Sequence, residues 1–188
     1  MESLRIPSPD LLIGRKTLIV GKIRSGKTKL TAQILSGILS LVKDEEVTVI
    51  DLAPEKEGLG RRLTNYLRLP EGSRYLRPEG LHAPRLEGRD SEEVLRLARI
   101  NESIAKPLLL IFLQEPTRVL VMNDITIYLH SGDLSLILDC ISSSETFLGN
   151  AYYGKGEFDD KGSGLNERER ELVEELMRRA DVILKLSP

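Results

Sequence analysis

The residues with the clearest chemical meaning form a glycine-bounded run near the start of the chain, Gly21-Lys22-Ile23-Arg24-Ser25-Gly26-Lys27-Thr28. This run fits the pattern G-x-x-x-x-G-K-[ST] at each defining position. The two glycines let the backbone wrap so that successive N–H groups point at an anion. The pattern predicts a loop that cradles nucleotide phosphates, with Lys27 between the β- and γ-phosphates and Thr28 offering its hydroxyl to Mg²⁺.

The flanking sequence supplies the elements that such a loop requires. Residues 17–20 have the pattern of a short buried strand, and apolar residues recur at helical spacing over 27–43. The positive end of the helix dipole would add to the attraction for phosphate. A chance glycine-rich turn is therefore the weaker interpretation, and the expected phosphate-binding residues are Gly21, Lys22, Ile23, Arg24, Ser25, Gly26, Lys27, Thr28 and Lys29.

A phosphate loop also needs an acid to hold the magnesium ion, normally at the end of a hydrophobic strand beside the loop strand. Residues 119–122 have the pattern of that strand, but Asn123 follows it and the carboxylate comes one position later, at Asp124. Either a register shift directs the Asp124 carboxylate toward the metal ion, or Asn123 occupies the ligand position and the ion is bound more weakly. We favour Asp124, so the expected metal ligands are Thr28 and Asp124.

Asp51 is the second acid of interest, because it lies near the end of another β-branched strand over 47–52. Ligands bind at the carboxyl ends of the strands in open α/β sheets. A role as general base or second metal-side acid is about as well supported as a role in a turn or helix cap. The expected catalytic residues are therefore Lys27, Asp51 and Asp124.

Composition limits the class of protein. The 188 residues, 40 % of them hydrophobic, suit one domain over 1–188. A single cysteine, Cys140, excludes an internal disulfide, and no apolar run reaches the length of a membrane span. We expect a cytoplasmic protein that contacts no membrane. The formal net charge of −2 argues against general nucleic-acid binding, although seven arginines between positions 61 and 89 could face an anionic ligand.

The rest of the chain alternates between strand and helix patterns. We expect helices over 58–69, 91–104 and 134–141, a short helix or strand after Pro107, and strands over 146–149, 182–186 and, at an edge, 81–83. A glycine-rich loop covers 154–164, and the last helix is expected to begin with Asn166 as N-cap and Glu169 at its third position. About six strands alternating with helices predict a three-layer α/β fold with a mostly parallel sheet and helices on both faces.

Other side chains are less specific. The two histidines, His82 and His130, have no second nitrogen or thiol ligand nearby in the sequence, so a hydrogen-bonding role is the better interpretation of His130. Tyr152 and Tyr153 could stack on a base, although packing at the end of a sheet is commoner. The guanine-recognition pattern N-K-x-D is absent, which argues against a switch GTPase.

The phosphate loop, with Arg24-Ser25-Gly26-Lys27-Thr28, resembles that of the adenosylcobinamide kinase / adenosylcobinamide-phosphate guanylyltransferase family. Three later stretches are similar to motifs of the same family: 124–129, 149–154 and the segment from Gly164 to Val182. The resemblance implies a RecA-like P-loop NTPase fold and a nucleotide-dependent kinase.

The chain departs from that family at three positions. The family's guanylate-accepting histidine has no counterpart in 61–66, its metal-binding acid aligns with Asn123, and a glutamate aligns with Ala151. Guanylyl transfer is therefore not expected.

Two functions remain open. The first is an enzyme that binds Mg²⁺ with ATP, or with GTP, and hydrolyses the γ-phosphate or transfers it to an unknown small-molecule acceptor. The alternative is a regulatory ATP-binding switch with slow or no turnover that acts through a protein partner. Assembly into a homo-oligomer is compatible with either.

Overall fold

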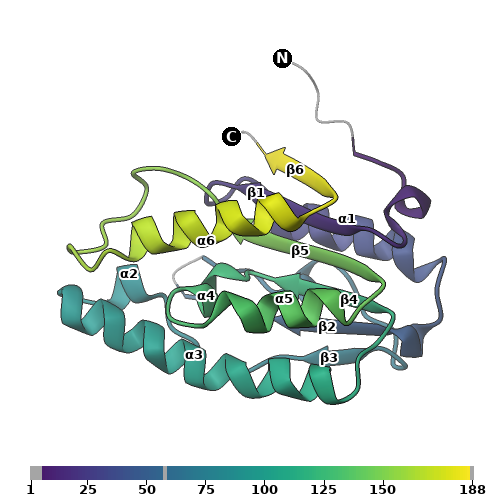
Figure 1. Ribbon diagram of the computed structural model, residues 1–188, viewed down its shortest axis with the longest axis horizontal. Helices are drawn as coiled ribbons and strands as arrows, with labels where there is room; N and C mark the ends of the chain where they lie inside the picture. Colours follow the sequence, from purple (N-terminus) through teal and green to yellow (C-terminus); the bar gives the residue numbers. More distant parts are fainter. Residues whose placement is uncertain (1–5, 57–58, 187–188) are drawn as a thin grey trace.

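A six-stranded parallel sheet forms the centre of the protein. The computed structural model describes residues 6–56 and 59–186, and the strand order is β3-β2-β4-β5-β1-β6 (Figure 1). Each strand is parallel to its neighbours. The strands are β1 (Lys16–Gly21), β2 (Val47–Asp51), β3 (Arg74–Leu76), β4 (Val119–Asn123), β5 (Thr146–Tyr152) and β6 (Val182–Leu186).

Helices cover both faces of this sheet, which confirms the three-layer α/β prediction. One face packs on α1 (Lys27–Leu39), and the other on α3 (Ser91–Gln114), α5 (Leu134–Ser142) and α6 (Leu165–Arg179). Short elements complete the chain: η1 (Pro9–Leu12), η2 (Asp44–Glu46), η3 (Leu63–Asn65), α2 (Pro84–Glu87) and α4 (Thr126–Leu129).

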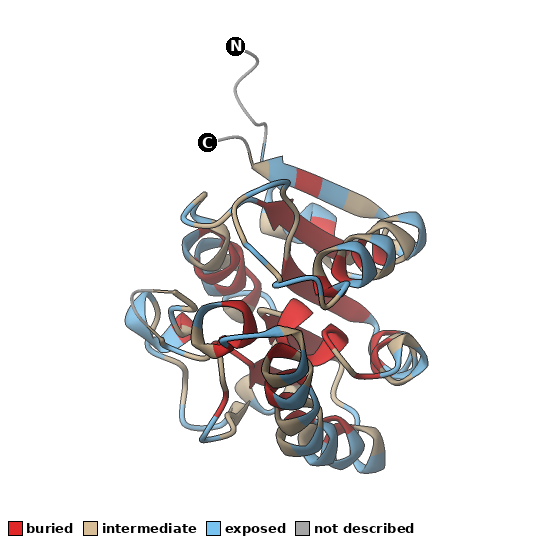
Figure 2. Ribbon diagram, turned by 90° about the vertical axis from the view of Figure 1, so that its left-hand side faces the viewer, coloured by how far each residue is buried: buried red, intermediate tan, exposed pale blue. Residues whose placement is uncertain are grey.

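The strand sequences explain this layering. In β4 the side chains of Leu120 and Met122 enter the core under α3, α5 and α6, whereas Val119 and Val121 pack on the α1 side. All five β4 residues are buried, as Figure 2 shows for the central strands. Burying each large aliphatic side chain stabilises the fold by about 1.5–3 kcal/mol, so a strand with two apolar faces is most stable inside the sheet.

Helix α3 differs from the sequence expectation, which divided this region at Pro107. The helix continues through Pro107 without interruption for 24 residues. A proline in a helix interior costs about 3 kcal/mol because it lacks the N–H donor and crowds the preceding turn. The buried residues on both sides of Pro107 fall on one helical face, and their packing outweighs that cost: Val94, Leu97, Ala98, Asn101, Ala105, Leu109 and Phe112.

Two other expectations for the first half were wrong. The helix expected over 58–69 is absent from the described part, where only the 3-10 turn η3 forms; Gly58 itself lies outside the described residues. The strand expected over 81–83 does not form, and β3 occupies that edge of the sheet instead. Proline and glycine interrupt this region repeatedly, so it has no periodic apolar face that could direct a regular element.

The sheet order brings distant loops to one edge. The sequence predicts that the strand ending at Asn123 lies beside the strand of the phosphate loop. In the structure β5 lies between these two strands, β4 and β1, so they are not adjacent. Since all six strands are parallel, the segments that follow β1, β2, β4 and β5 leave the sheet at the same edge. Residues from these four segments form the site described next.

Candidate nucleotide site

The loop between β1 and α1 has the conformation that its glycines predicted. Gly26 caps α1 with φ +90°, in the left-handed region where a side chain is strained. At Gly21 a Cβ atom would lie 2.7 Å from Ser25 Oγ and 2.9 Å from the Leu186 carbonyl oxygen, so only glycine fits. The loop therefore wraps tightly and ends at the amino terminus of a 13-residue helix, an arrangement that attracts anions.

Lys27 lies across this loop. Its Nζ donates hydrogen bonds to the carbonyl oxygens of Lys22 (2.6 Å) and Gly21 (3.0 Å). The Tyr152 ring centroid is 5.9 Å from the same nitrogen. Burial lowers the pKa of Lys27, while nearby carboxylates, Asp124 first, oppose that shift. Lys27, the lysine that the motif defines, is thus held where a phosphate chain on the loop would meet it.

A hydrogen-bonded group of polar side chains joins α1 to the ends of β4 and β5. Thr28 Oγ1 donates to Asn123 Oδ1 at 3.3 Å, and Asn150 Nδ2 donates to the same oxygen at 2.7 Å. Asn150 Oδ1 in turn accepts from the Asp124 backbone N–H at 2.9 Å. Sequence reasoning did not select Asn150; its place directly after the apolar run of β5 is the signal that could have found it.

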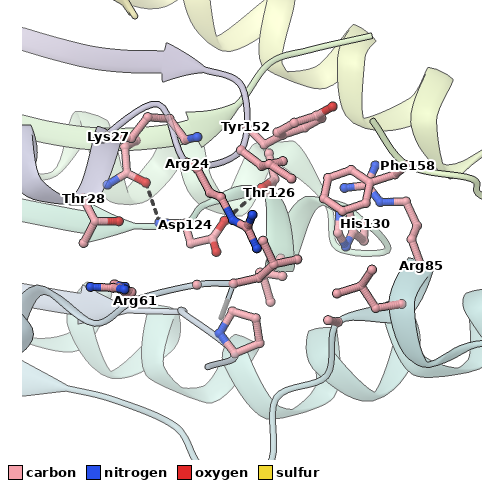
Figure 3. A pocket seen from close by; sticks show the side chains of 18 of the residues that line it. Arg24, Lys27, Thr28, Arg61, Arg85, Asp124, Thr126, His130, Tyr152 and Phe158 are labelled. Carbon is pink, nitrogen blue, oxygen red and sulfur yellow. Dashed lines mark hydrogen bonds between the residues drawn. The ribbon is translucent and has the colours of Figure 1, made fainter. Parts of the chain in front are cut away.

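Asp124 is turned out of the strand register and lines the cavity in front of the phosphate loop. Its φ of +60° is unusual for a residue other than glycine, and it directs the carboxylate away from the buried position of Asn123. Thr126 Oγ1 donates to Asp124 Oδ1 at 3.1 Å. Burial raises the pKa of Asp124, and the positive charge of Lys27 opposes the rise. Lys27, Thr28 and Asp124 therefore share one cavity (Figure 3).

Asp51 has a different environment. Its Oδ1 accepts from Asn123 Nδ2 (2.7 Å) and the Ala53 N–H (3.3 Å), and its Oδ2 accepts from the Leu63 N–H (2.8 Å) and the Tyr75 hydroxyl (2.9 Å). The side chain is fully buried and does not line the cavity. The structure thus does not bring Asp51 together with the other two expected catalytic residues.

The cavity itself has a volume of about 420 Å³ and extends from the phosphate loop to α2 and α4. Its wall carries five cationic side chains, Arg24, Lys27, Lys29, Arg61 and Arg85. Asp124 is the only carboxylate among the described residues that line it. The wall also carries apolar side chains, among them Ala83, Pro84, Leu86, Ile127 and Phe158. A polyanion and an apolar group would both find a complementary surface on this wall.

Sequence reasoning missed a buried ionic cluster next to this cavity. Glu169 accepts two hydrogen bonds from the Arg85 guanidinium (2.7 and 3.0 Å) and lies 2.6 Å from His130 Nε2. All three side chains are buried. The sequence predicts Asn166 as the N-cap of the last helix and Glu169 at its third position, but the N-cap of α6 is Gly164, with φ +77°. The Asn166 amide oxygen instead accepts from Arg85 at 2.7 Å.

The glycine-rich segment 154–164 forms neither helix nor strand, as expected, and it contacts the phosphate loop. Glu157 makes an ion pair with Lys22 at 3.3 Å and accepts a hydrogen bond from the Tyr152 hydroxyl. Tyr152 and Phe158 pack edge to face, with ring centroids 5.3 Å apart. A carboxylate from this segment thus lies beside a residue of the phosphate loop.

Two features are absent from the part of the chain that the structure describes. No group of three or more His, Cys, Asp or Glu side chains is arranged to hold a metal ion within residues 6–56 and 59–186. No helix in those ranges is both long and apolar enough to cross a membrane.

Comparison with known structures supports the three-layer α/β fold. The flagellar accessory protein FlaH from Methanocaldococcus jannaschii aligns with TM-score 0.51 and 12 % identity, covering 97 % of this chain and 78 % of that one. The Pif1 helicase from Candida albicans aligns with TM-score 0.37 and 12 % identity over 99 % of this chain and 40 % of its own, a similarity too low to carry an argument. Neither the protein-family models nor the curated proteins compared with the chain gave a match. The resemblance to adenosylcobinamide kinase stays a prediction.

Proposed function

We propose that the protein binds ATP, or GTP, with Mg²⁺ and hydrolyses the γ-phosphate or transfers it to a small molecule. One observation carries this proposal: Lys27, Thr28 and Asp124 line a single cavity in front of the phosphate loop. The tight conformation of that loop requires glycine at positions 21 and 26. The loop N–H groups and the start of α1 would bind the phosphates. Lys27 would neutralise the charge that develops during phosphoryl transfer.

The residues present fit a magnesium ion. Mg²⁺ prefers oxygen ligands and is normally shared between one or two protein groups and the phosphates of a nucleotide. Thr28 and Asp124 supply a hydroxyl and a carboxylate on the cavity wall. The Asn123 amide oxygen already accepts from Thr28 and Asn150, so we assign Asn123 the role of holding Thr28 in place. When bound, the ion neutralises charge on the phosphates.

Asp51 has no place in this proposal as a base. Its two oxygens accept four hydrogen bonds from groups that belong to the end of the sheet and the following turn. A carboxylate so occupied stabilises the segment after β2 and has no lone pair directed at the cavity. Asp124 is the only described carboxylate on the cavity wall, which supports it as the group that orients the magnesium shell or an attacking water.

One contact favours the alternative function, a nucleotide-dependent switch with slow turnover. Glu157 pairs with Lys22 in the phosphate loop, so a bound phosphate would compete for the same ammonium group. Nucleotide binding would then release segment 154–164 for a protein partner. The apolar side chains on the cavity wall, in contrast, favour an enzyme with a small-molecule acceptor.

Turnover separates the two functions. Phosphate release and ADP formation are measured with purified protein and MgATP, with and without candidate acceptors. ADP formation that rises at least tenfold with an acceptor supports a kinase, and slow acceptor-independent hydrolysis supports a switch. Asp124→Asn should lower either rate about 100-fold while MgATP still binds, and Glu102→Gln, on α3, serves as the matched control. Unchanged turnover in the Asp124 variant would refute the assigned role.

A further inference from the structure

Arg24 has an unusual backbone conformation in the middle of the phosphate loop. Its φ of +57° lies in the left-handed region, which few residues other than glycine adopt. A residue with a Cβ atom is strained there, and strain of this kind often gathers at functional sites. Glycine would take the same conformation without strain, so the backbone gives no reason for an arginine at this position.

Arg24 shares this feature with Asp124. Among the described residues other than glycine, positive φ angles occur at Arg24, Glu55, Asp124 and Lys161. Two of these four, Arg24 and Asp124, line the cavity in front of the phosphate loop. One follows β1 and the other follows β4, so two strained positions on separate segments bring opposite charges to the same cavity.

The Arg24 side chain is directed into this cavity. Figure 3 shows it extending from the loop into the cavity, in the direction of Asp124. The residue is exposed, and no hydrogen bond or ion pair joins its guanidinium to another residue within 6–56 and 59–186. Its charge and its five N–H donors are therefore available to a ligand in the cavity.

Two of the other four cationic side chains on the wall are already engaged. Lys27 Nζ donates to two carbonyl oxygens of the loop, and Arg85 is bound to Glu169 in the buried cluster. Lys29 and Arg61 come from the first turn of α1 and from the segment after β2. Arg24 is thus the cation that the loop itself, ahead of α1, adds to the wall.

The proposed function determines where the last phosphate would lie. Lys27 would contact the β- and γ-phosphates, and Thr28 and Asp124 would hold the ion that the phosphates share. The γ-phosphate would therefore lie in the cavity between Lys27 and Asp124, and the Arg24 side chain extends into this space. A guanidinium can donate two parallel N–H bonds to a pair of phosphate oxygens.

We infer that Arg24 is a catalytic residue of the proposed function, on which this inference rests, and that its guanidinium binds the γ-phosphoryl group more tightly during transfer than before it. The oxygen of water, or of an acceptor hydroxyl, attacks the γ-phosphorus, and the bond from that phosphorus to the β–γ bridging oxygen breaks. The attacking group releases its proton to solvent, and Arg24 keeps its own. The products are the nucleoside diphosphate and either phosphate or a phosphate monoester.

An exposed arginine in this position contributes more to the rate than to nucleotide binding. A long side chain loses conformational freedom when it is ordered, and water screens its attraction to the bound triphosphate, so the two effects nearly cancel in the Kd. During transfer, charge spreads over the oxygens of the γ-phosphoryl group, and an arginine that contacts them raises kcat by about 10³–10⁵-fold. An interaction made only in the transition state affects kcat and leaves the Kd unchanged.

Three variants of the full chain test this role. Arg24→Gly removes the side chain and suits the positive φ, Arg24→Lys keeps the charge without the planar fork, and Arg99→Gln removes an exposed arginine from α3 as the control. We expect the kcat of phosphate release from MgATP to fall about 1,000-fold in Arg24→Gly and at least tenfold in Arg24→Lys. The Kd of a non-hydrolysable ATP analogue should stay within about threefold in all three.

A purely structural role of Arg24 in the loop predicts a different pattern. Arg24→Gly would then keep the kcat of the wild type, because glycine takes the loop conformation without strain. That result, or full activity in Arg24→Lys with loss only of nucleotide affinity, would overturn the inference. Thermal melting followed by circular dichroism checks that each variant folds.

A transition-state analogue tests the same contact without turnover. Tetrafluoroaluminate with MgADP resembles the γ-phosphoryl group during transfer, and ¹⁹F NMR follows its binding. The wild type should bind it, and Arg24→Gly should bind it at least 100-fold more weakly while still binding MgADP. Equal binding in both proteins, or none in the wild type, would count against Arg24. If neither protein binds MgATP, the proposed function fails; if both bind MgATP and tetrafluoroaluminate equally, only the role of Arg24 is refuted.

Discussion

Replacing Glu169 by glutamine would break the buried ionic cluster that joins α2, α4 and α6. The carboxylate accepts from both Arg85 nitrogens and contacts His130, and Arg85 is only 8 % exposed. A glutamine amide offers one acceptor oxygen, and its NH₂ group would face the donors of Arg85. The substitution therefore leaves a buried guanidinium without a counter-charge.

The magnitude follows from that unpaired charge. Removing one partner of a buried ion pair costs about 3–5 kcal/mol, against a total free energy of unfolding of about 5–15 kcal/mol for an ordinary domain. The matched control is Glu175→Gln on the same helix. Glu175 pairs with Arg178 and Arg179 at the surface, and its removal should leave the urea midpoint unchanged within error.

The pH dependence gives a second check. Although burial raises the pKa of Glu169, His130 and Arg85 lower it below the usual 4.5. A carboxyl group with a depressed pKa in the folded state stabilises the fold above its unfolded pKa, and that stabilisation is lost as the pH falls through the folded pKa. The wild type should therefore lose more stability than Glu169→Gln as the pH falls below 4.5.

Urea denaturation followed by circular dichroism measures both effects, at pH 7 and at steps below pH 4.5. The unfolding free energy should fall by about 3–5 kcal/mol in Glu169→Gln at pH 7, with an unchanged slope. A loss under about 1 kcal/mol, or parallel pH profiles for the variant and the wild type, would refute the reasoning.

Three other outcomes are expected. Asn123→Asp puts a second carboxylate against Asp51, which Asn123 Nδ2 now contacts at 2.7 Å, so the urea midpoint should drop at pH 7 and partly recover on acidification; a higher midpoint at pH 7 would contradict this. Burial raises the pKa of Cys140 to about 12, so the thiol should react with a disulfide reagent at pH 8 only after unfolding, and prompt labelling of native protein would be contrary evidence. Gly26→Ala strains the left-handed cap, and thermal melting should show a loss of about 1–2 kcal/mol, whereas an unchanged melt would show that the position tolerates a side chain.

The phosphate loop could be predicted because its information is local. Gly21, Gly26, Lys27 and Thr28 lie within eight residues, and the strand before them and the helix after them are periodic in the sequence. The three-layer architecture followed from the same kind of pattern, since buried parallel strands are apolar on both faces. Pro107 misled the prediction because a local rule was overridden by packing along the whole of α3.

The distant parts of the site could not be predicted in this way. Glu169 lies 84 residues from Arg85 and 39 from His130 in the chain, and its spacing after Asn166 is also that of a helix cap. Which of Asn123 and Asp124 lines the cavity depends on one backbone angle, the φ of +60° at Asp124, which no residue pattern encodes. Apolar spacing likewise did not show that β5 would lie between β1 and β4.

The central claim is that the loop from Gly21 to Thr28 binds nucleotide phosphates, and calorimetric titration with MgATP tests it most directly. The wild type should bind one nucleotide per chain. Lys27→Ala should weaken the Kd at least tenfold, about 1.4 kcal/mol, with an unchanged melting temperature. Lys106→Ala, which removes an exposed lysine from α3, should bind as the wild type does. Equal MgATP affinity in Lys27→Ala and the wild type would contradict the account.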